Sequence, residues 1–484
     1  MSEADVAARE VYDDGPLYAA SQKVYPQKVR GTFRRLKWRL LIFCLAVYYF
    51  LPFVRWDRGP NLPNQAALAD LAHSRFYFFF IELWPQEVIY ITGLLILASL
   101  ALFLSNALLG RVWCGYFCPQ TVWTDLFLSV ERLIEGDRRD RMKLDDAPWT
   151  REKITKRVAK HGVWLIIAWW TGGAFVLYLS DAPTLVRDLA TFQAPISAYA
   201  WIGILTFTTY YLAGHMREQV CLYMCPWPRI QAALTDPDAL NVTYRRDRGE
   251  PRMSLKEAAR ARAGSLPAGD CIDCKQCIAV CPTGVDIRKG AQLGCIGCGL
   301  CIDACDAVME KVRRPARLIA FDTDENIKRR ARGEAPVYRL VRPRTILYVA
   351  LIAVVSIVMV FGLARRKDLG LDVLHVRAPM FTTTKEGGVR NGYTLRFINK
   401  NGESRTFALE VSGVEGAVLK SDQMDRLPDG RFGVTVDPDA TEQEEVYVTA
   451  PREAIGAGGR PVTFTSIDLK TNASVSVVDN FFGP

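Results

Sequence analysis

The chain has 484 residues, half of them hydrophobic and 23% charged, with a formal net charge of +9. This composition excludes a disordered chain, which has too little apolar surface to fold, and a wholly membrane-embedded chain, which carries far fewer charges. The basic excess lies before residue 368, because the remainder has 12 Lys and Arg against 17 Asp and Glu. It flanks apolar runs instead of forming the basic face of a nucleic-acid-binding domain, so no nucleic-acid partner is expected.

Five apolar runs predict membrane spans in a multidomain membrane protein. After a polar N-terminal segment (1–37), residues 38–235 contain four runs, at 40–54, 88–109, 163–179 and 196–212. A fifth run at 346–363 predicts a last transmembrane helix over residues 345–364. Their lengths approach the roughly 20 residues that cross a bilayer. We therefore expect an α-helical transmembrane part of about five spans.

The distribution of Lys and Arg predicts the orientation of these spans. The connection 110–162 carries eleven, whereas 55–87 carries three and 180–195 carries only Arg187. By the positive-inside rule, we expect the N-terminal segment, the 110–162 loop and residues 236–344 in the cytoplasm. The chain after the fifth span then lies on the other side of the membrane.

Two cysteine pairs repeat one motif at the edge of the membrane part. Cys114 and Cys118 precede Pro119 after the second span, and Cys221 and Cys225 precede a proline after the fourth. Cysteines four apart share one face of a helix, and a following proline suits the first position of the next helix. Thiolates are soft ligands for Cu(I), zinc or iron-sulfur clusters. The alternative is that these cysteines are small buried hydrophobes at helix ends.

The segment 271–305 holds eight cysteines in two C-x2-C-x2-C-x3-C runs, the spacing of two-cluster bacterial ferredoxins. In this pattern the fourth cysteine of each run ligates the other cluster. Zinc sites use pairs instead of triplets, and disulfides require an oxidising compartment. We predict two [4Fe-4S] clusters in a ferredoxin-like domain (core 265–312), with Asp306 where the second run usually has proline. The predicted ligands are Cys271, Cys274, Cys277 and Cys305 for one cluster and Cys295, Cys298, Cys301 and Cys281 for the other.

Residues 371–484 alternate between apolar and polar side chains with period two, as strands do. Turn signals at Asn391-Gly392, Asn401-Gly402 and Asp429-Gly430 separate the alternating segments. We expect an immunoglobulin-like β-sandwich without a disulfide, because no cysteine follows Cys305. The alternating residues are Tyr393, Leu395 and Phe397, then Phe407, Leu409 and Val411, then Phe432, Val434 and Val436, then Val446 and Val448, and last Val475 and Val477.

Several single residues are weaker candidates. Glu82 would suit a quinone or proton site if it lay within hydrocarbon, and a solvated carboxylate if it lay at the interface. His215, with Met216 and Met224, lies near the second cysteine pair, but packing is the competing interpretation. The same two interpretations apply to His375 and Met380 after the last span. Cys44, inside the first run, is expected to pack against lipid or helix.

With these motifs in this order, the chain resembles the family of cytochrome c oxidase accessory proteins known as CcoG, FixG or RdxA. The resemblance covers nearly the whole chain, from the two C-x3-C-P pairs to the C-terminal sandwich. It implies a protein of the bacterial inner membrane, with the ferredoxin domain cytoplasmic and the sandwich periplasmic.

This resemblance also implies a cupric reductase that serves the assembly of cbb3-type cytochrome c oxidase. Copper would then bind at Cys114, Cys118, Cys221 and Cys225, and oxidase assembly factors or copper chaperones would be the partners. The residues by themselves indicate an electron-transfer membrane protein with soft-metal sites and an electron donor that the sequence does not identify. Two other functions stay open: a quinol-oxidising ferredoxin that supplies a periplasmic reductase, and a non-enzymatic assembly scaffold or copper carrier.

Overall fold

The computed structural model describes residues 23–59, 62–365, 369–384, 387–438, 440–454 and 459–483. Most of the predicted N-terminal segment, residues 1–22, lies outside this part. The chain divides into two compact units. The first ends at Arg55 and continues over Gln65–Ile357, and the second consists of Trp56–Asn64 and the chain from Val358 onward.

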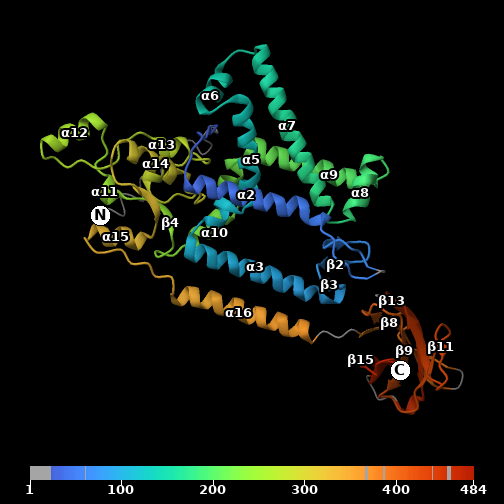
Figure 1. Ribbon diagram of the computed structural model, residues 1–484. Helices are drawn as coiled ribbons and strands as arrows, with labels where there is room; N and C mark the ends of the chain where they lie inside the picture. Colours follow the sequence, from blue (N-terminus) through green and yellow to red (C-terminus); the bar gives the residue numbers. More distant parts are fainter. Residues whose placement is uncertain are drawn as a thin grey trace. The chain divides into compact units, whose positions relative to one another are not determined.

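Helices form most of the first unit, and the last of them, α16, continues past the end of this unit at Ile357 (Figure 1). They are α2 (Thr32–Phe50), α3 (Val88–Leu109), α4 (Val112–Tyr116), α5 (Pro119–Glu135), α6 (Arg138–Asp146), α7 (Arg151–Val176), α8 (Ala182–Ala190), α9 (Ile196–Thr209), α10 (Trp227–Leu234) and α16 (Pro343–Ala364). Short 3-10 helices lie at η1 (Leu51–Phe53) and η2 (Pro85–Glu87). Two π-helices, η3 (Tyr210–Met216) and η4 (Val220–Met224), follow α9. Between α2 and α3, the strands β1 (Ala67–Asp70), β2 (Arg75–Phe78) and β3 (Ile81–Leu83) form a small antiparallel sheet.

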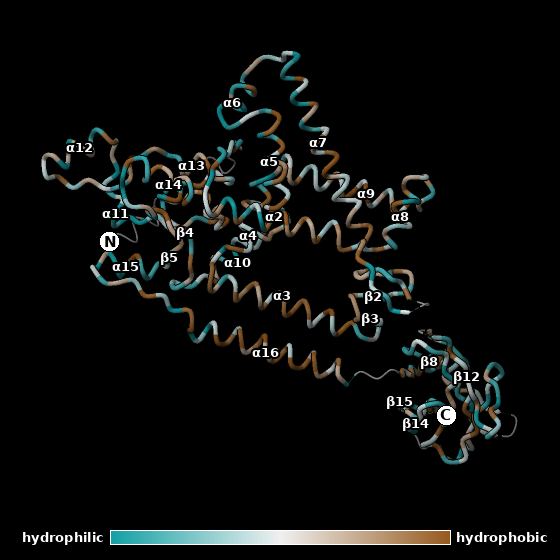
Figure 2. Tube along the Cα trace, viewed as in Figure 1, coloured by the Kyte–Doolittle hydropathy of each residue, from teal (hydrophilic) through white to brown (hydrophobic). Residues whose placement is uncertain are grey.

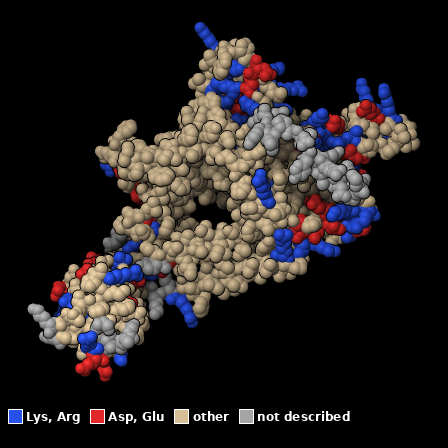
Figure 3. Space-filling model, turned by 180° about the vertical axis from the view of Figure 1, so that it is seen from behind, with Lys and Arg blue, Asp and Glu red and all other residues tan. Residues whose placement is uncertain are grey.

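Three of the described helices are long and apolar enough to cross a membrane: Thr32–Phe53, Val88–Leu109 and Pro343–Ala364. Figure 2 shows the hydrophobic colouring along α3 and α16, and Figure 3 shows a broad surface of the first unit without charged side chains. These helices coincide with the first, second and fifth predicted spans. At the other two predicted spans, α7 carries a charged N-terminal half and α9 has only 14 residues. The spans predicted there therefore remain predictions.

A two-stranded sheet pairs the chain before the eight-cysteine segment (271–305) with the chain after it. Strand β4 (Asn241–Tyr244) pairs antiparallel with β5 (Ile319–Asp322), although about 75 residues separate them in the chain. Between the two strands lie α11 (Arg246–Gly249), α12 (Leu255–Ala263), α13 (Gln276–Ala279), η5 (Ile287–Lys289) and α14 (Leu300–Lys311), and α15 (Asp324–Ala331) follows. The sheet and α14 pack around a core that includes Ile302 and Met309.

A carboxylate of the eight-cysteine segment caps the first long helix. Asp303, on α14, accepts hydrogen bonds from the backbone N–H groups of Phe33 (3.2 Å) and Arg34 (2.7 Å) in the first turn of α2. These N–H groups have no partner within the helix, and the helix dipole favours a negative charge at this end. A side chain at Gly31 would collide with Asp303. The eight-cysteine segment is therefore docked directly on a candidate membrane helix.

The second unit is a β-sandwich. One sheet has the order β10-β13-β8-β6, with β7 also paired to β8, and the other has the order β11-β12-β9-β14-β15. The strands are β6 (Leu369–His375), β7 (Thr382–Thr383), β8 (Val389–Asn399), β9 (Arg405–Ser412), β10 (Val418–Lys420), β11 (Asp425–Arg426), β12 (Phe432–Val436), β13 (Ala440–Ala450), β14 (Arg460–Asp468) and β15 (Ser474–Phe481), with a 3-10 turn, η6 (Arg452–Ala454).

The predicted period-two strands are confirmed as β8, β9, β12, β13 and β15. Tyr393, Leu395 and Phe397 are each fully buried, and they alternate with more exposed neighbours along β8. Val475 and Val477 are only partly buried, because β15 is at the edge of its sheet. All the described pairings in the two sheets are antiparallel, as in other β-sandwiches.

One predicted turn is wrong. Asn401-Gly402 and Asp429-Gly430 lie between strands, but Asn391-Gly392 lies inside β8. The Asn391 side chain is fully buried, donates to the Phe482 carbonyl (2.8 Å) and accepts from the Phe482 N–H (3.0 Å). These long-range hydrogen bonds satisfy the amide inside the sandwich and override its local preference for a turn.

The capping of α2 by Asp303 predicts that this contact stabilises the folded protein. We expect Asp303→Ala to lower the free energy of unfolding by about 1–2 kcal/mol, because two helix N–H groups lose their acceptor. Denaturant titration of the purified protein, followed by circular dichroism, measures this change. Glu310→Ala, at an exposed position of the same helix, is the matched control, and an equal loss in both variants would contradict the capping role.

Candidate metal centres

The structure divides the eight cysteines of residues 271–305 into two neighbouring sets. Cys305 lies within electrostatic range of the first triplet, and Cys281 within range of the second. Cys301 also interacts with Cys277, so the two sets adjoin. The first set is Cys271, Cys274, Cys277 and Cys305, and the second set is Cys281, Cys295, Cys298 and Cys301. This grouping is consistent with the exchanged-ligand pattern, and the assignment of individual ligands stays a prediction.

The two triplets share one backbone conformation. In the first, the residues on either side of the middle cysteine, Asp273 (φ 49°) and Lys275 (φ 54°), are left-handed. The corresponding residues in the second are Gly297 (φ 67°) and Gly299 (φ 71°). Left-handed residues turn the chain tightly, so successive thiols of a triplet point toward a common centre. The second triplet adopts this conformation with glycine, which pays no steric penalty for it.

The surroundings of both sets fit a bound cationic centre. Burial, together with repulsion from neighbouring thiolates, raises the pKa of Cys277, Cys295 and Cys305 to about 12. Apolar clusters surround the sulfur atoms and exclude water. Metal binding to such thiols displaces their protons and satisfies their charge. The residues therefore fit two [4Fe-4S] clusters, which supply one-electron transfer when bound.

The two C-x3-C-P pairs come together although about a hundred residues separate them. Cys114 lies on α4 and Cys118 is the residue before α5, whereas Cys221 lies on η4 and Cys225 directly follows it. Cys114 is within electrostatic range of the other three thiols, and Cys221 is within range of Cys118 and Cys225. We call these four residues the four-cysteine site. Burial raises the pKa of Cys114 and Cys221 to about 12, and their mutual repulsion adds to it.

Local structure positions the two pairs differently. Pro119 occupies the first position of α5, as predicted, whereas Pro226 precedes α10, which begins one residue later at Trp227. The second pair lies on a π-helix, in which the Cys225 N–H donates to the Val220 carbonyl five residues earlier (2.8 Å). The α-helical spacing expected for this pair is therefore replaced by a wider turn. π-helical turns often occur at functional sites.

Buried ionic contacts hold the junction between the two π-helices. Arg217, between η3 and η4, has a positive φ of 44° and pairs with Glu131 of α5 (3.0 Å). Its Nε also donates to the Gly214 carbonyl (2.7 Å). Glu131 pairs in addition with Arg141 (3.0 Å), and Gln120 donates to the Leu212 and Arg217 carbonyls. This network fixes where η4 begins and hence where Cys221 lies.

Among the residues that the structure describes, no three His, Cys, Asp or Glu side chains are arranged to hold a single metal ion. A [4Fe-4S] cluster spreads its four thiolates around a cube, and its ligands are farther apart than those of one ion. Copper held by one C-x3-C pair needs only two thiolates. The four thiols of the four-cysteine site have the chemistry that soft metal ions and iron-sulfur clusters favour.

The second set adjoins the four-cysteine site. The Tyr116 hydroxyl, two residues from Cys114, donates to the Cys298 carbonyl (3.0 Å). A side chain at Gly115 would lie 2.8 Å from the Ile296 carbonyl oxygen and 3.1 Å from Cys298 Cα. Cys221 also lines a small cavity together with Pro282, Thr283 and Ile296 of the eight-cysteine segment. The two sites therefore meet through direct backbone contact.

The other candidates near the membrane part have structural partners. His215 stacks on His161, with ring centroids 5.7 Å apart, and Tyr210 bonds His161 Nδ1 (2.9 Å). Met216 ends η3 and Met224 is 56% exposed. Glu82, on β3, pairs with Arg75 (3.3 Å), and its side chain is 14% exposed, so its carboxylate has an ionic partner at this position. Cys44 is partly buried on α2.

Two further residues are explained by local contacts. His375 Nε2 contacts the Asn391 amide oxygen (2.8 Å), and its ring packs edge-on against Tyr393 and Phe482. These contacts favour packing over metal binding, and Met380 is half-exposed. Asp306, where proline is usual, accepts a hydrogen bond from the Arg317 N–H (2.7 Å) and pairs with its guanidinium (3.4 Å). Asp306 thus anchors the chain that follows α14.

Three protein families match parts of the chain. A 4Fe-4S dicluster domain matches residues 216–324, and the immunoglobulin-like fold at the C-terminus of FixG matches 359–484. A 4Fe-4S binding domain matches residues 91–135, which include Cys114 and Cys118. The first two matches confirm the predicted ferredoxin-like domain and immunoglobulin-like sandwich.

Two curated relatives are similar over most of the chain. The nitrogen fixation protein FixG of Rhizobium meliloti is 47% identical over 464 residues, which cover 90% of this chain and 88% of FixG. Protein RdxA of Cereibacter sphaeroides is 47% identical over 458 residues, 94% of each chain. A crystal structure of a FixG-related protein from Vibrio parahaemolyticus matches 24% of this chain and 96% of that one, with 19% identity and a TM-score of 0.20.

The division of the cysteines into two sets makes a prediction about iron content. We expect Cys305→Ser and Cys281→Ser each to lower the iron content of anaerobically purified protein from about eight to about four atoms per chain. Iron analysis with electron paramagnetic resonance (EPR) spectroscopy checks this, because the two variants should lose different cluster signals. Cys44→Ser should keep all the iron. If both variants lost the same signal, the exchanged-ligand assignment would be wrong.

Proposed function

The chain belongs to the family of FixG and RdxA, and on this premise we propose that it reduces Cu(II) to Cu(I) at the four-cysteine site. It is an oxidoreductase of the iron-sulfur type, with 4Fe-4S domains. The observation that carries the finer proposal is the direct contact between the second cysteine set and the four-cysteine site. In this proposal, the Cu(I) is for the copper centre of cbb3-type cytochrome c oxidase, and the partners are its assembly factors or copper chaperones.

The chemistry of the four-cysteine site supports reduction of copper. Each Cu(II) accepts one electron, and the electron comes from a cytosolic one-electron carrier or from a membrane quinol. Thiolates are soft ligands and stabilise Cu(I) relative to Cu(II). Burial of Cys114 and Cys221 adds to this preference, because the less charged ion costs less to remove from water. The roles of Cys114, Cys118, Cys221 and Cys225 in this proposal are to bind copper and favour its reduced state.

We propose that the eight-cysteine segment and the four-cysteine site face the cytoplasm, and that the sandwich is periplasmic. Two observations support this orientation. The connection 110–162 carries eleven Lys and Arg, and positively charged connections stay in the cytoplasm. The cytosol also keeps exposed thiols reduced, and Cys274 is exposed.

A second candidate occupant of the four-cysteine site is a third [4Fe-4S] cluster. The match of a 4Fe-4S binding domain to residues 91–135 favours it, because this stretch contains the first C-x3-C-P pair. The protein would then pass electrons to a partner instead of to copper. Metal analysis separates the two occupants, since three clusters bring about twelve irons per chain and two bring about eight.

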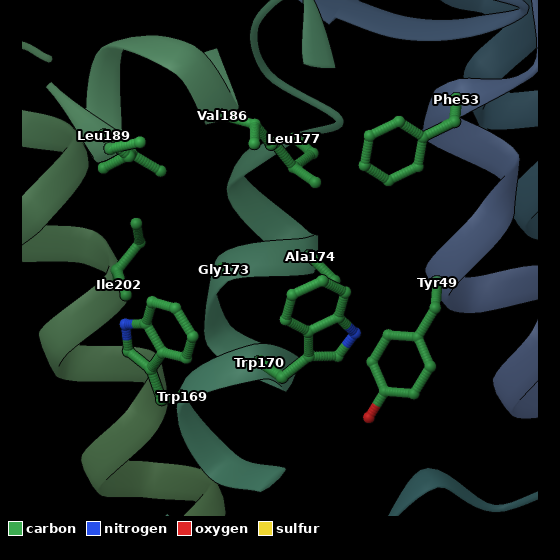
Figure 4. A pocket seen from close by; sticks show the side chains of 11 residues that line it. Tyr49, Phe53, Trp169, Trp170, Gly173, Ala174, Leu177, Val186, Leu189 and Ile202 are labelled. Carbon is green, nitrogen blue, oxygen red and sulfur yellow. The ribbon is translucent and has the colours of Figure 1, made fainter. Parts of the chain in front are cut away.

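The quinol-oxidising alternative finds little support in the apolar pocket beside α2. This pocket, of about 290 Å³, lies among α2, α7, α8 and α9 and is lined by Tyr49, Trp169 and Trp170 (Figure 4). The Tyr49 hydroxyl is already hydrogen-bonded to Thr171 (2.8 Å). Tyr49 also lies 12 residues along α2 from Lys37, which lines the cavity at Cys221. That separation is about 18 Å along a helix, so a quinol there would be remote from the cysteines.

Removal of the four thiols tests the proposed copper site. We expect the combined change of Cys114, Cys118, Cys221 and Cys225 to Ser to abolish Cu(I) binding and to leave the cluster absorbance unchanged. Dithionite-reduced protein, freed of excess reductant, is mixed with Cu(II), and a Cu(I)-specific chelator reports the product. Cys44→Ser is the matched thiol control.

Other outcomes of this experiment identify the alternatives. If copper still binds to the Ser variant, the site is misplaced. If the variant instead loses about four irons, the third-cluster occupant is correct. If wild-type protein binds copper but forms no Cu(I) from Cu(II), the protein is a carrier or scaffold.

A further inference from the structure

We infer that Lys37 and Arg111, two cations between the second cysteine set and the four-cysteine site, make the second set the stronger electron acceptor of the two sets. They would thereby direct electrons toward the four-cysteine site. This inference rests on the proposed electron transfer and adds the residues that set its direction.

Lys37 is buried at the junction of the two sites. It lies on α2, is 3% exposed, and lines the same small cavity as Cys221, Pro282 and Ile296. Its ammonium group is within electrostatic range of Cys221 in the four-cysteine site and of Cys298 in the second set. A lysine is seldom buried so completely without a reason, since removing its charge from water is costly.

The carboxylate nearest to Lys37 is already neutralised by another cation. Asp125 accepts two hydrogen bonds from Arg34, at 2.9 and 2.8 Å, whereas its distance to the Lys37 ammonium is 3.8 Å. Two cations therefore share one carboxylate. Lys37, Arg34 and Asp125 together keep one positive charge. The Glu218 carboxyl lines the same cavity, and burial raises its pKa, which favours its uncharged form.

Arg111 occupies the corresponding position on the other side of the junction. It precedes α4, and its guanidinium donates to the carbonyls of Leu293, Cys295 (3.1 Å) and Pro228 (2.8 Å). These acceptors are neutral, so the hydrogen bonds orient the guanidinium without cancelling its charge. Arg111 is within electrostatic range of Cys295 in the second set and of Cys114 in the four-cysteine site. Each of the two cations is thus within electrostatic range of one thiol in the four-cysteine site and one thiol in the second set.

The first cysteine set has a different electrostatic environment. Its nearest cation, Arg288, pairs with both Asp286 (2.8 Å) and Asp273, so two carboxylates offset one guanidinium. Arg314, close to Cys271, lies 4.0 Å from Asp270. Asp306, near Cys305, is already paired with the Arg317 guanidinium (3.4 Å). Asp270 also pairs with Arg248 (3.0 Å) and Arg262 (3.3 Å), so the arginines near the first set are ion-paired.

By contrast, Lys37 is 3% exposed and shares its carboxylate with Arg34, and the hydrogen-bond acceptors of Arg111 are neutral carbonyls. The positive field is therefore stronger at the second set, where carboxylates and water screen it less.

This difference in electrostatic field favours one direction of electron transfer. An added electron makes a centre more negative, and a nearby positive charge stabilises it more strongly where water is excluded. The second set, between Lys37 and Arg111, should therefore hold an electron more firmly than the first set does. An electron that enters at the first set would then move to the second set, which contacts the four-cysteine site.

An EPR-monitored redox titration of Lys37→Met tests the inference. The full chain is purified anaerobically without copper and titrated in detergent, and cluster signals are assigned with Cys281→Ser and Cys305→Ser. We expect the midpoint potential of the second-set centre to fall by about 59 mV, which corresponds to a tenfold weaker hold on one electron. The first-set centre should keep its potential. Lys37→Arg, which retains the charge, should titrate as the wild type does.

Matched variants separate charge from folding. Arg35→Gln removes a positive charge from the exposed face of the same helix and should change neither potential. Arg111→Gln should lower the second-set potential and Arg111→Lys should restore most of it, so the inference does not depend on one variant. Iron content equal to that of the wild type shows that each variant is folded.

The inference fails if Lys37→Met and Arg111→Gln, both with full iron, titrate as the wild type does, or if both clusters shift equally. This outcome differs from a failure of the proposed copper reduction. The titration contains no copper, so a protein that does not reduce Cu(II) would still show the shift.

Discussion

The close backbone contact between residues 110–116 and 293–298 is the constraint on which the arrangement of the cysteines depends. Gly115 has no room for a side chain against Ile296 and Cys298, and Gly297 faces the backbone of Arg111 with a positive φ of 67°. Any residue larger than glycine at position 115 would push the two segments apart. Because the segments carry Cys114 on one side and Cys295 and Cys298 on the other, this contact fixes the separation of the two sites. Electron transfer depends steeply on such a separation.

The contact is supported by polar groups that are buried with partners. Asp303 caps α2 from the eight-cysteine segment, and Arg34 of the same helix binds Asp125 of α5. On α5, the cations around Glu131 hold the pKa of this carboxyl at about 2, although burial opposes ionisation. Breaking one member of such a group leaves an uncompensated buried charge, which is costly. Helices α2 and α5 and the π-helical junction are therefore locked to each other, and the cysteines they carry are held in a fixed arrangement.

Local spacing in the sequence was sufficient to predict much of the cysteine chemistry. Three thiols separated by two residues each can face a common centre within one short segment. The alternation of Tyr393, Leu395 and Phe397 indicates one buried face of a strand. The same reasoning failed where contacts between segments far apart in the sequence determine the local structure. Asn391-Gly392 was predicted as a turn, but the buried hydrogen bonds of Asn391 place it inside a strand. The π-helix at Cys221 depends on the ion pair between Arg217 and Glu131, which lies 86 positions away in the chain. Lys37 and Arg111 resembled ordinary flanking charges, since only the folded chain shows that both lie between two groups of thiols.

The positive charge at the junction would act in the same way on both candidate occupants of the four-cysteine site. Copper(I) with two thiolates and a [4Fe-4S] cluster with four thiolates both carry a net negative charge, as does a cluster held by the second set. Two anionic centres in contact would repel each other strongly in a poorly screened interior. Lys37 and Arg111 are each within electrostatic range of thiols on both sides, where their positive charge reduces this repulsion. The two cations therefore allow two electron-accepting sites to lie side by side, whichever metal the four cysteines bind. The structure of the junction thus determines the path of the electron more closely than it determines the identity of the final acceptor.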